Sequence, residues 1–279
     1  MKKDKKKKDV GEDYSNFALR LVLICTILIL GSSIIFAFRN NFIEDDKKKE
    51  EMEVDQELID LLYSYVAYGK EIKSMQYFYV NDTLTKDTFD NFEKVKYAFQ
   101  LVNENNVNDL TETGFTIDKD TYQKLVNTIF GQDSEIENAK EFEVISTNVL
   151  KDSIVNVKYA ETQNKYIVTK IKDFDRPMIS PVYTKVIDSA VDSTNNTIII
   201  KEKVIFTSVD YDKEGHVSNI KVYKDSFHQK LIKEVTTHVN YPMEEFNFEN
   251  YLEDAITVTY TFKLSDDGNY YFESSKIEE

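Results

Sequence analysis

The sequence predicts an α+β fold in which a single N-terminal transmembrane helix precedes an exterior domain with helices first and a curved antiparallel sheet afterwards. Three observations predict it. Residues 21–38 form an uncharged apolar run, helical periodicity dominates residues 53–131, and β-branched, partly alternating segments dominate residues 141–279. The sheet is expected to consist of a meander and a C-terminal hairpin.

The apolar run at residues 21–38 is the strongest signal in the chain. It contains no charged residue and would extend roughly 27 Å as a helix, close to the roughly 30 Å hydrocarbon core of a bilayer. Residues 1–20 hold seven Lys or Arg against four Asp or Glu, whereas the flank after the run is mixed in sign. The positive-inside rule therefore places the N-terminus in the cytoplasm and the C-terminal domain outside the cell membrane.

Three other interpretations of this run compete with a retained anchor. A cleaved signal peptide needs small residues before the cut, and only Gly31 to Ser33 and Ala37 offer a weak version. A lipoprotein would use Cys25, but Ile24 stands where a small residue is required. A buried core helix does not fit the charge asymmetry of the flanks. We therefore expect the lipid bilayer to be the partner of this run, with cleavage as the alternative.

The expected organisation follows from the shifts in composition. It comprises a Lys-rich cytoplasmic tail (1–20), the transmembrane helix (21–38), a charged juxtamembrane spacer (39–52) and an extracytoplasmic domain (53–279) with a helical part (53–131) and a mainly β part (141–279). Hydrophobic residues make up 41% of the 279 residues and aromatic residues 13%, enough for a packed core. Few Arg against many Lys, with abundant Asn, Ile and Tyr, indicates an AT-rich bacterial genome.

Charge and cysteine content exclude several classes of function. The net charge is −15, and because the first 20 residues carry +3, the remainder carries −18. Such a domain repels phosphate backbones, so nucleic acid is not expected as a partner. Cys25 is the one cysteine and lies in the apolar run, so the exterior has no disulfide, thiolate nucleophile or cysteine metal cluster.

Apolar residues recur three and four positions apart in three segments, which predicts three amphipathic helices. The segments are 55–66, 85–102 and 118–131. Thr85 or Asp87 is the expected N-cap of the second helix, and Asp118 that of the third. Gly131 follows the third helix, where positive φ is favoured.

Short β-branched segments with polar breaks predict strands in the second half. The segments are 141–149, 154–160 and 165–171, then a meander of 182–191, 197–209 and 216–224, and a hairpin of 255–264 and 270–277. Two further segments, 226–235 and 244–255, are ambiguous and would fit short helices on the sheet.

The segment DYDKEGHV resembles the opening of an EF-hand calcium loop through Asp210, Asp212, Glu214 and Gly215. An EF-hand loop needs a carboxylate at position twelve and helices on both sides. Position twelve is Lys221, and both flanks have strand character. We therefore interpret these carboxylates as a hairpin turn, with weak calcium binding as the alternative.

The sequence contains no recognisable motif for zinc binding, nucleophilic catalysis or phosphate binding. His216, His228 and His238 do not match a zinc motif, and neither a nucleophile motif nor a Gly-rich phosphate loop is present. No catalytic, cofactor-binding or metal-binding residue is assigned, and no cofactor is expected. The loop around Arg176 is a contact surface or an ordered turn.

The sequence predicts a non-enzymatic, membrane-anchored extracytoplasmic binding or interaction module of a bacterial cell envelope, with a protein or envelope component as partner. Two alternatives remain open. One is an anchored envelope hydrolase that uses an Asp or Glu pair, and the other is an accessory or regulatory subunit of a membrane complex.

Overall fold

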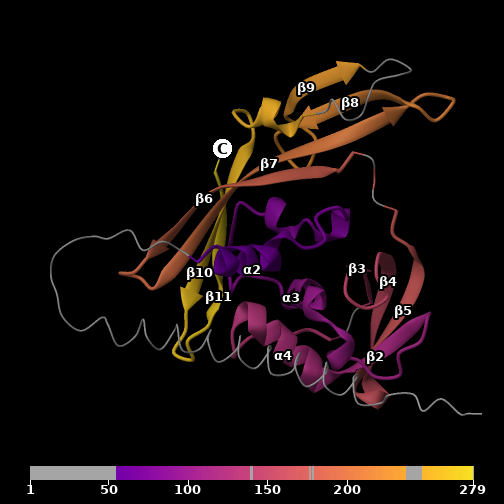
Figure 1. Ribbon diagram of the computed structural model, residues 1–279, viewed down its shortest axis with the longest axis vertical. Helices are drawn as coiled ribbons and strands as arrows, with labels where there is room; N and C mark the ends of the chain where they lie inside the picture. Colours follow the sequence, from indigo (N-terminus) through magenta and orange to yellow (C-terminus); the bar gives the residue numbers. More distant parts are fainter. Residues whose placement is uncertain (1–54, 139–140, 176, 178, 237–246, 279) are drawn as a thin grey trace, which may run out of the picture. The chain divides into compact units, whose positions relative to one another are not determined.

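A computed structural model describes residues 55–138, 141–175, 177, 179–236 and 247–278 (Figure 1). Residues Met52–Glu279 form one compact unit. Of the described residues, 42% lie in strands and 24% in helices, including short 3-10 turns. The fold is therefore built mainly from sheet.

The α+β prediction, with helices first and one curved sheet afterwards, is wrong. The strands form two separate sheets, and two of them, β1 (Thr83–Thr85) and β2 (Gly114–Asp118), interrupt the half predicted to be helical. These strands are too short to show a period of two against the helical periodicity around them. In the described part of the chain, no helix combines the length and apolar character needed to cross a membrane. The run at residues 21–38, where the sequence predicts a transmembrane helix, lies outside the described residues.

The described helical elements are three α-helices and six 3-10 turns. They are α2 (Gln56–Ala67), α3 (Asn91–Ala98), α4 (Lys119–Phe130), η1 (Lys73–Met75), η2 (Tyr77–Tyr79), η3 (Phe99–Leu101), η4 (Glu104–Asn106), η5 (Glu161–Gln163) and η7 (Phe248–Tyr251). The remaining strands are β3 (Phe142–Ser146), β4 (Ser153–Ala160), β5 (Lys165–Asp173), β6 (Val182–Asp192), β7 (Thr197–Tyr211), β8 (Val217–Tyr223), β9 (Leu231–Thr236), β10 (Ile256–Leu264) and β11 (Tyr270–Glu278).

Helix α3 begins later than the sequence indicates. Its N-cap is Asp90, whose carboxylate accepts hydrogen bonds from the backbone N–H groups of Phe92 (2.8 Å) and Glu93 (3.2 Å). Thr85, one of the two expected caps, belongs instead to β1, so the chain must turn before the helix starts. Gly131 ends α4 with φ of 93°.

The larger sheet has seven antiparallel strands in the order β1-β11-β10-β7-β8-β9, with β6 also paired to β7. Strand β7 organises it, because its first half lies between β6 and β10 and its last residues pair with β8. The two segments whose secondary structure the sequence left ambiguous, 226–235 and 244–255, form different elements. Residues 226–235 end in strand β9, and residues 247–255 contain the 3-10 turn η7.

The smaller sheet is antiparallel with the order β2-β5-β4-β3. Helix α4 contacts β2 of this sheet and β11 of the larger one, so it connects the two (Figure 1). The ring of Tyr122 on α4 stacks on Tyr166 of β5 with centroids 4.4 Å apart. The Tyr122 hydroxyl donates to the carbonyl of Val95 on α3, 2.8 Å away.

Phe78, in η2, is the aromatic centre of the core and is only 1% exposed. Its ring contacts Tyr97 of α3 at 4.9 Å, and it also contacts Tyr260 and Phe272 of the larger sheet at 5.5 and 5.3 Å between centroids. These edge-to-face arrangements are favourable for aromatic rings. The η1–η2 segment is therefore packed between α3 and the sheet.

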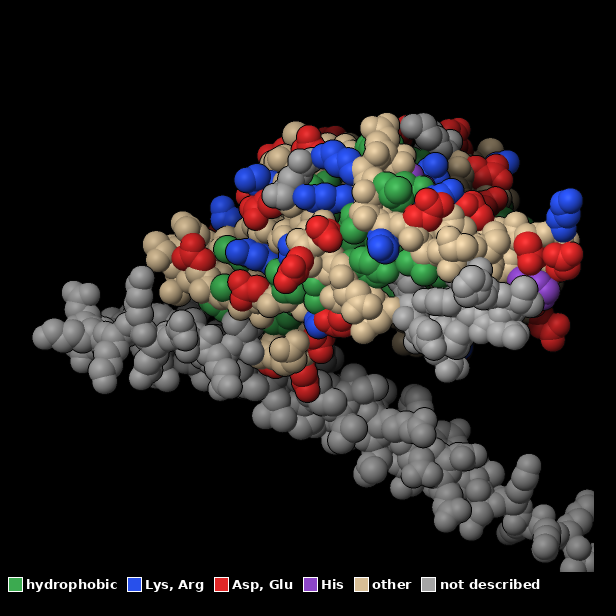
Figure 2. All heavy atoms as spheres, turned by 90° about the horizontal axis from the view of Figure 1, so that it is seen from above, with side chains coloured by type: hydrophobic (Ala, Val, Ile, Leu, Met, Phe, Trp, Pro, Cys, Tyr) green, Lys and Arg blue, Asp and Glu red, His purple; other side chains and the backbone are tan. Residues whose placement is uncertain are grey.

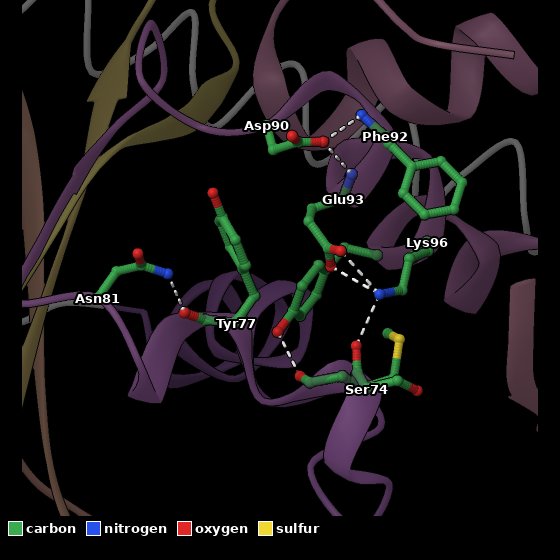
Figure 3. Close-up of polar contacts among 9 residues, drawn as sticks. Ser74, Tyr77, Asn81, Asp90, Phe92, Glu93 and Lys96 are labelled. Carbon is green, nitrogen blue, oxygen red and sulfur yellow. Dashed lines mark hydrogen bonds and ion pairs between the residues drawn. The ribbon is translucent and has the colours of Figure 1, made fainter. Parts of the chain in front are cut away.

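Polar contacts also attach the η1–η2 segment to α3 (Figure 3). Lys96, only 5% exposed, donates to the carbonyl of Ser74 at 2.6 Å and pairs with the carboxylate of Glu93 at 2.8 Å. Asn81 donates to the carbonyl of Tyr77 at 2.9 Å. The bond of Asn81 is local to the chain after η2, so it is the bonds of Lys96 that attach the segment to α3, at η1.

Replacing Phe78 by Ala is expected to lower the free energy of unfolding by about 3–5 kcal/mol, because the cavity would open among four aromatic rings. Chemical denaturation of the full chain measures this change. Phe227→Ala is the matched control, since this Phe is 67% exposed and should change stability by no more than about 0.5 kcal/mol. Equal effects of the two substitutions would contradict the assignment of Phe78 to the core.

Candidate functional site

A surface cleft of about 200 Å³ lies where three parts of the fold meet. Tyr79 and Val80 contribute from η2 and its end, and Ile256 and Ile277 contribute from β10 and β11. The third wall is the β8–β9 loop, residues 224–230. We call this feature the cleft.

The β8–β9 loop is held in shape by Asp225. The Asp225 carboxylate accepts hydrogen bonds from the backbone N–H groups of Phe227 (3.0 Å), Gln229 (3.1 Å) and Lys230. His228 has φ of 59° and its ring stacks on Tyr223, 4.5 Å between centroids. With the loop backbone fixed in this way, the Phe227 side chain stays 67% exposed at the edge of the cleft.

The floor of the cleft is tied to a buried carboxyl group. Tyr79 is 3% exposed, and its ring lies edge-on to Phe206 of β7 at 6.0 Å. Glu202 of β7 is fully buried and accepts hydrogen bonds from the hydroxyls of Tyr63 (2.6 Å) and Tyr260 (2.5 Å). Burial raises the pKa of Tyr79, with the charge of Glu202 as a smaller cause, and the Tyr79 hydroxyl has no hydrogen-bond partner among the described residues.

Burial has the largest effect on the pKa of the Glu202 carboxyl group. Desolvation raises the pKa of Glu202 above its ordinary value, while hydrogen bonds from Tyr260 and Tyr63 and the charge of Lys70 act in the opposite direction. Desolvation likewise raises the pKa of Tyr63, Tyr79 and Tyr260, with the Glu202 charge as the next cause. The three tyrosines therefore remain protonated at neutral pH, and Tyr63 and Tyr260 donate to Glu202.

The environment of Glu202 suits a structural role. Its side chain has no exposure to solvent, and its two oxygens accept from tyrosines of α2 and β10. A hydrolytic carboxyl group must reach both substrate and water. The Glu202 carboxyl instead fixes α2 and β10 against β7.

Of the carboxylates that resemble a calcium loop, Asp210 lies near the end of β7, where it is paired with Asn219 of β8, and Asp212 and Glu214 lie in the hairpin turn that follows. Asp210 forms an ion pair with Lys221 at 2.8 Å. Asp212 accepts hydrogen bonds from the backbone N–H groups of Glu214 (3.0 Å) and His216 (2.8 Å), which is the bonding of a turn. Ligand atoms of Asp212, Glu214 and His216 lie within 4.8 Å of one another, so the group of three differs from the three residues indicated by the sequence.

The remaining residues that the sequence singles out do not converge. His216 lies in the β7–β8 turn and His228 in the β8–β9 loop, at opposite ends of β8. His238 and Arg176 lie outside the described residues. On the face shown in Figure 2, acidic and basic side chains are interspersed with hydrophobic ones and do not form a continuous patch of one sign.

Sequence reasoning missed the cleft. The signal it could have used is the segment KDSFHQK, in which a Phe stands alone among polar residues between two strands. Single exposed hydrophobic residues are common, so the lone Phe indicates a site only because the structure places it beside the cleft.

No protein family model, no curated protein and no solved structure matches this chain.

Excess calcium is expected to leave the thermal unfolding temperature of the full chain unchanged, because Asp210 is paired with Lys221 and Asp212 is bonded to the turn backbone. A ligand that binds only the folded state would raise this temperature. Differential scanning fluorimetry with and without calcium makes the measurement. A calcium-dependent rise that disappears in Asp212→Asn would establish calcium binding at the turn.

Glu202→Gln is expected to reduce the pH dependence of stability. Because burial raises the pKa of Glu202 in the fold, its contribution is fully present below about pH 4.5 and is lost as the pH rises through the folded-state pKa. The thermal unfolding temperature of the full chain should therefore fall less steeply between pH 4.5 and 8 in the variant than in the wild type. Glu214→Gln, on the exposed turn, is the control. If the unfolding temperature of Glu202→Gln depended on pH as steeply as that of the wild type, this would contradict the assignment of a raised pKa to Glu202.

Proposed function

We propose that this protein is a membrane-anchored extracytoplasmic binding module of a bacterial cell envelope, and that it engages a protein partner through the cleft. The observation that carries the proposal is the β8–β9 loop. Asp225 fixes the loop through three backbone amides, and the loop keeps Phe227 67% exposed beside a concave surface. Exposed aromatic residues in fixed positions are favourable anchors for partners.

The anchoring part of the proposal depends on the sequence. Residues 21–38 carry no charge, and the Lys-rich residues before them favour a cytoplasmic N-terminus. The lipid bilayer is then the partner of this run, and the domain that bears the cleft faces the outside of the cell. The acidic domain disfavours nucleic acid as a partner.

Binding fits the cleft better than catalysis does. The lining of the cleft combines apolar residues with two lysines and two aspartates, whereas the carboxyl of Glu202 is fully buried and bonded to two tyrosines. Interaction surfaces commonly combine an apolar centre with a polar rim.

A photo-crosslinking amino acid at position 227 of the full chain, tagged at its C-terminus, is expected to give one reproducible stoichiometric product in intact cells. Mass spectrometry identifies the partner. The control is the same amino acid at position 211, because Tyr211 is 63% exposed but lies at the opposite end of β8. Identical products at both positions, or recovery of the protein alone, would overturn the proposal.

A further inference from the structure

We infer that helix α2 is a pH-sensitive latch on the larger sheet: it is held most firmly while the buried carboxyl of Glu202 is protonated, and it opens more often once that carboxyl is ionised. The inference goes beyond the proposed function, because it concerns the attachment of α2 and not the cleft. Helix α2 is the first described element after the run at residues 21–38, which the sequence predicts to be the anchor. The latch would therefore act where the anchored part of the chain meets the domain.

Glu202 is the point at which α2 is bonded to the larger sheet. Its side chain has no exposure to solvent and lies on the buried face of β7, between Ile200 and Val204. The hydroxyl of Tyr63 on α2 lies 2.6 Å from Glu202 Oε2 and 3.0 Å from the hydroxyl of Thr184 on β6. Water can therefore reach the carboxyl only if α2 or another element packed on this face moves.

The titratable and charged groups that face Glu202 in the described part of the chain are four tyrosines and one lysine. They are Tyr63 of α2, Lys70 beyond the end of α2, Tyr79 of η2, Tyr97 of α3 and Tyr260 of β10. Burial raises the pKa of each tyrosine, so all four stay neutral at neutral pH. Among the acidic groups of this cluster, Glu202 is therefore the first to ionise as the pH rises.

Ionisation of Glu202 favours the open state of α2. Desolvation by burial raises the pKa of Glu202, and the hydrogen bonds from Tyr260 and Tyr63 and the charge of Lys70 offset this only in part. When α2 opens, water reaches the carboxyl and its pKa returns toward the ordinary value of 4.5. The closed state therefore binds the proton more tightly. Its advantage is fully present below about pH 4.5 and is lost as the pH rises through the closed-state pKa.

Helix α2 is the element around Glu202 that can open with the least disruption. Tyr260 donates to Glu202 from β10, but β10 is paired with β7 on one side and with β11 on the other. Displacing β10 would break two ladders of backbone hydrogen bonds, whereas those of α2 are internal to the helix. The open state is a minor one, because α2 also buries an apolar face, formed by Ile59, Leu62, Tyr65 and Val66.

Hydrogen exchange of the full chain in lipid nanodiscs, measured by mass spectrometry at about pH 5 and about pH 8, tests the inference. Each rate is divided by the intrinsic exchange rate at the same pH, because that rate also rises with pH. The protection of α2 should fall by up to about tenfold for each pH unit over which Glu202 titrates, since one proton links the two states. The protection of β4 and β5, in the smaller sheet, should fall less.

Three substitutions make the test specific. Glu202→Gln removes the titrating group at nearly constant volume, so the protection of α2 should no longer depend on pH. Tyr63→Phe should lower the protection of α2 by about tenfold or more at about pH 8, because the helix loses its bond to the charged carboxylate. Tyr65→Phe is the matched control on the same helix. The Tyr65 hydroxyl is not one of the donors to Glu202, so protection should stay within about twofold of the wild type.

Several outcomes would overturn the inference. An equal loss of protection in α2, β4 and β5 would show that only global stability responds to pH. Protection of α2 that does not change with pH in the wild type, or that changes as much in Glu202→Gln, would also contradict it. If Glu202→Gln does not fold, the tyrosine pair decides, because equal effects of Tyr63→Phe and Tyr65→Phe would exclude the latch. Crosslinking at position 227 tests the proposed function separately.

Discussion

The carboxyl group of Glu202 is the constraint on which the rest of the fold depends. A carboxyl group in the centre of a sheet, fully removed from water, is costly unless its oxygens are bonded. Tyr63 of α2 and Tyr260 of β10 supply those bonds from two different elements. The helix and the strand must therefore occupy one position relative to β7, since another register would leave a buried polar group without its donors.

The geometry of the cleft depends on this arrangement. Tyr79 lines the cleft, and the η1–η2 segment that carries it is held on α3 by the bonds of Lys96 (Figure 3). The other walls are continuous with β8, β10 and β11, which pair directly or through β10 with β7. The cleft is thus built on the rigid elements of the fold, which favours a preformed surface.

The sequence predicted the elements whose apolar residues recur at a regular spacing and missed the elements without such a pattern. Helices α2, α3 and α4 lie within the segments whose apolar residues recur at helical spacing, because that pattern reflects burial of one face. The three-residue strand β1 has no such pattern, and neither the second sheet nor the fold class followed from local periodicity. Glu202 could have been recognised, because Ile200 and Val204 alternate with it on the buried face of β7. The cleft could not, since its walls come from separate segments, the end of η2, the β8–β9 loop, β10 and β11, which local periodicity does not bring together.

The β8–β9 loop illustrates why an exposed side chain gains meaning only from what fixes it. Phe227 would attract no notice on a flexible loop, because apolar atoms make up much of any protein surface. Here Asp225 commits its carboxylate to three amides of the loop, and His228 adopts a left-handed conformation while stacking on Tyr223. Order in a loop costs conformational entropy, and a partner that meets an ordered loop does not have to supply that cost on binding. Preorganisation of an exposed aromatic residue beside a concave apolar surface is therefore what distinguishes the cleft from the rest of the described surface.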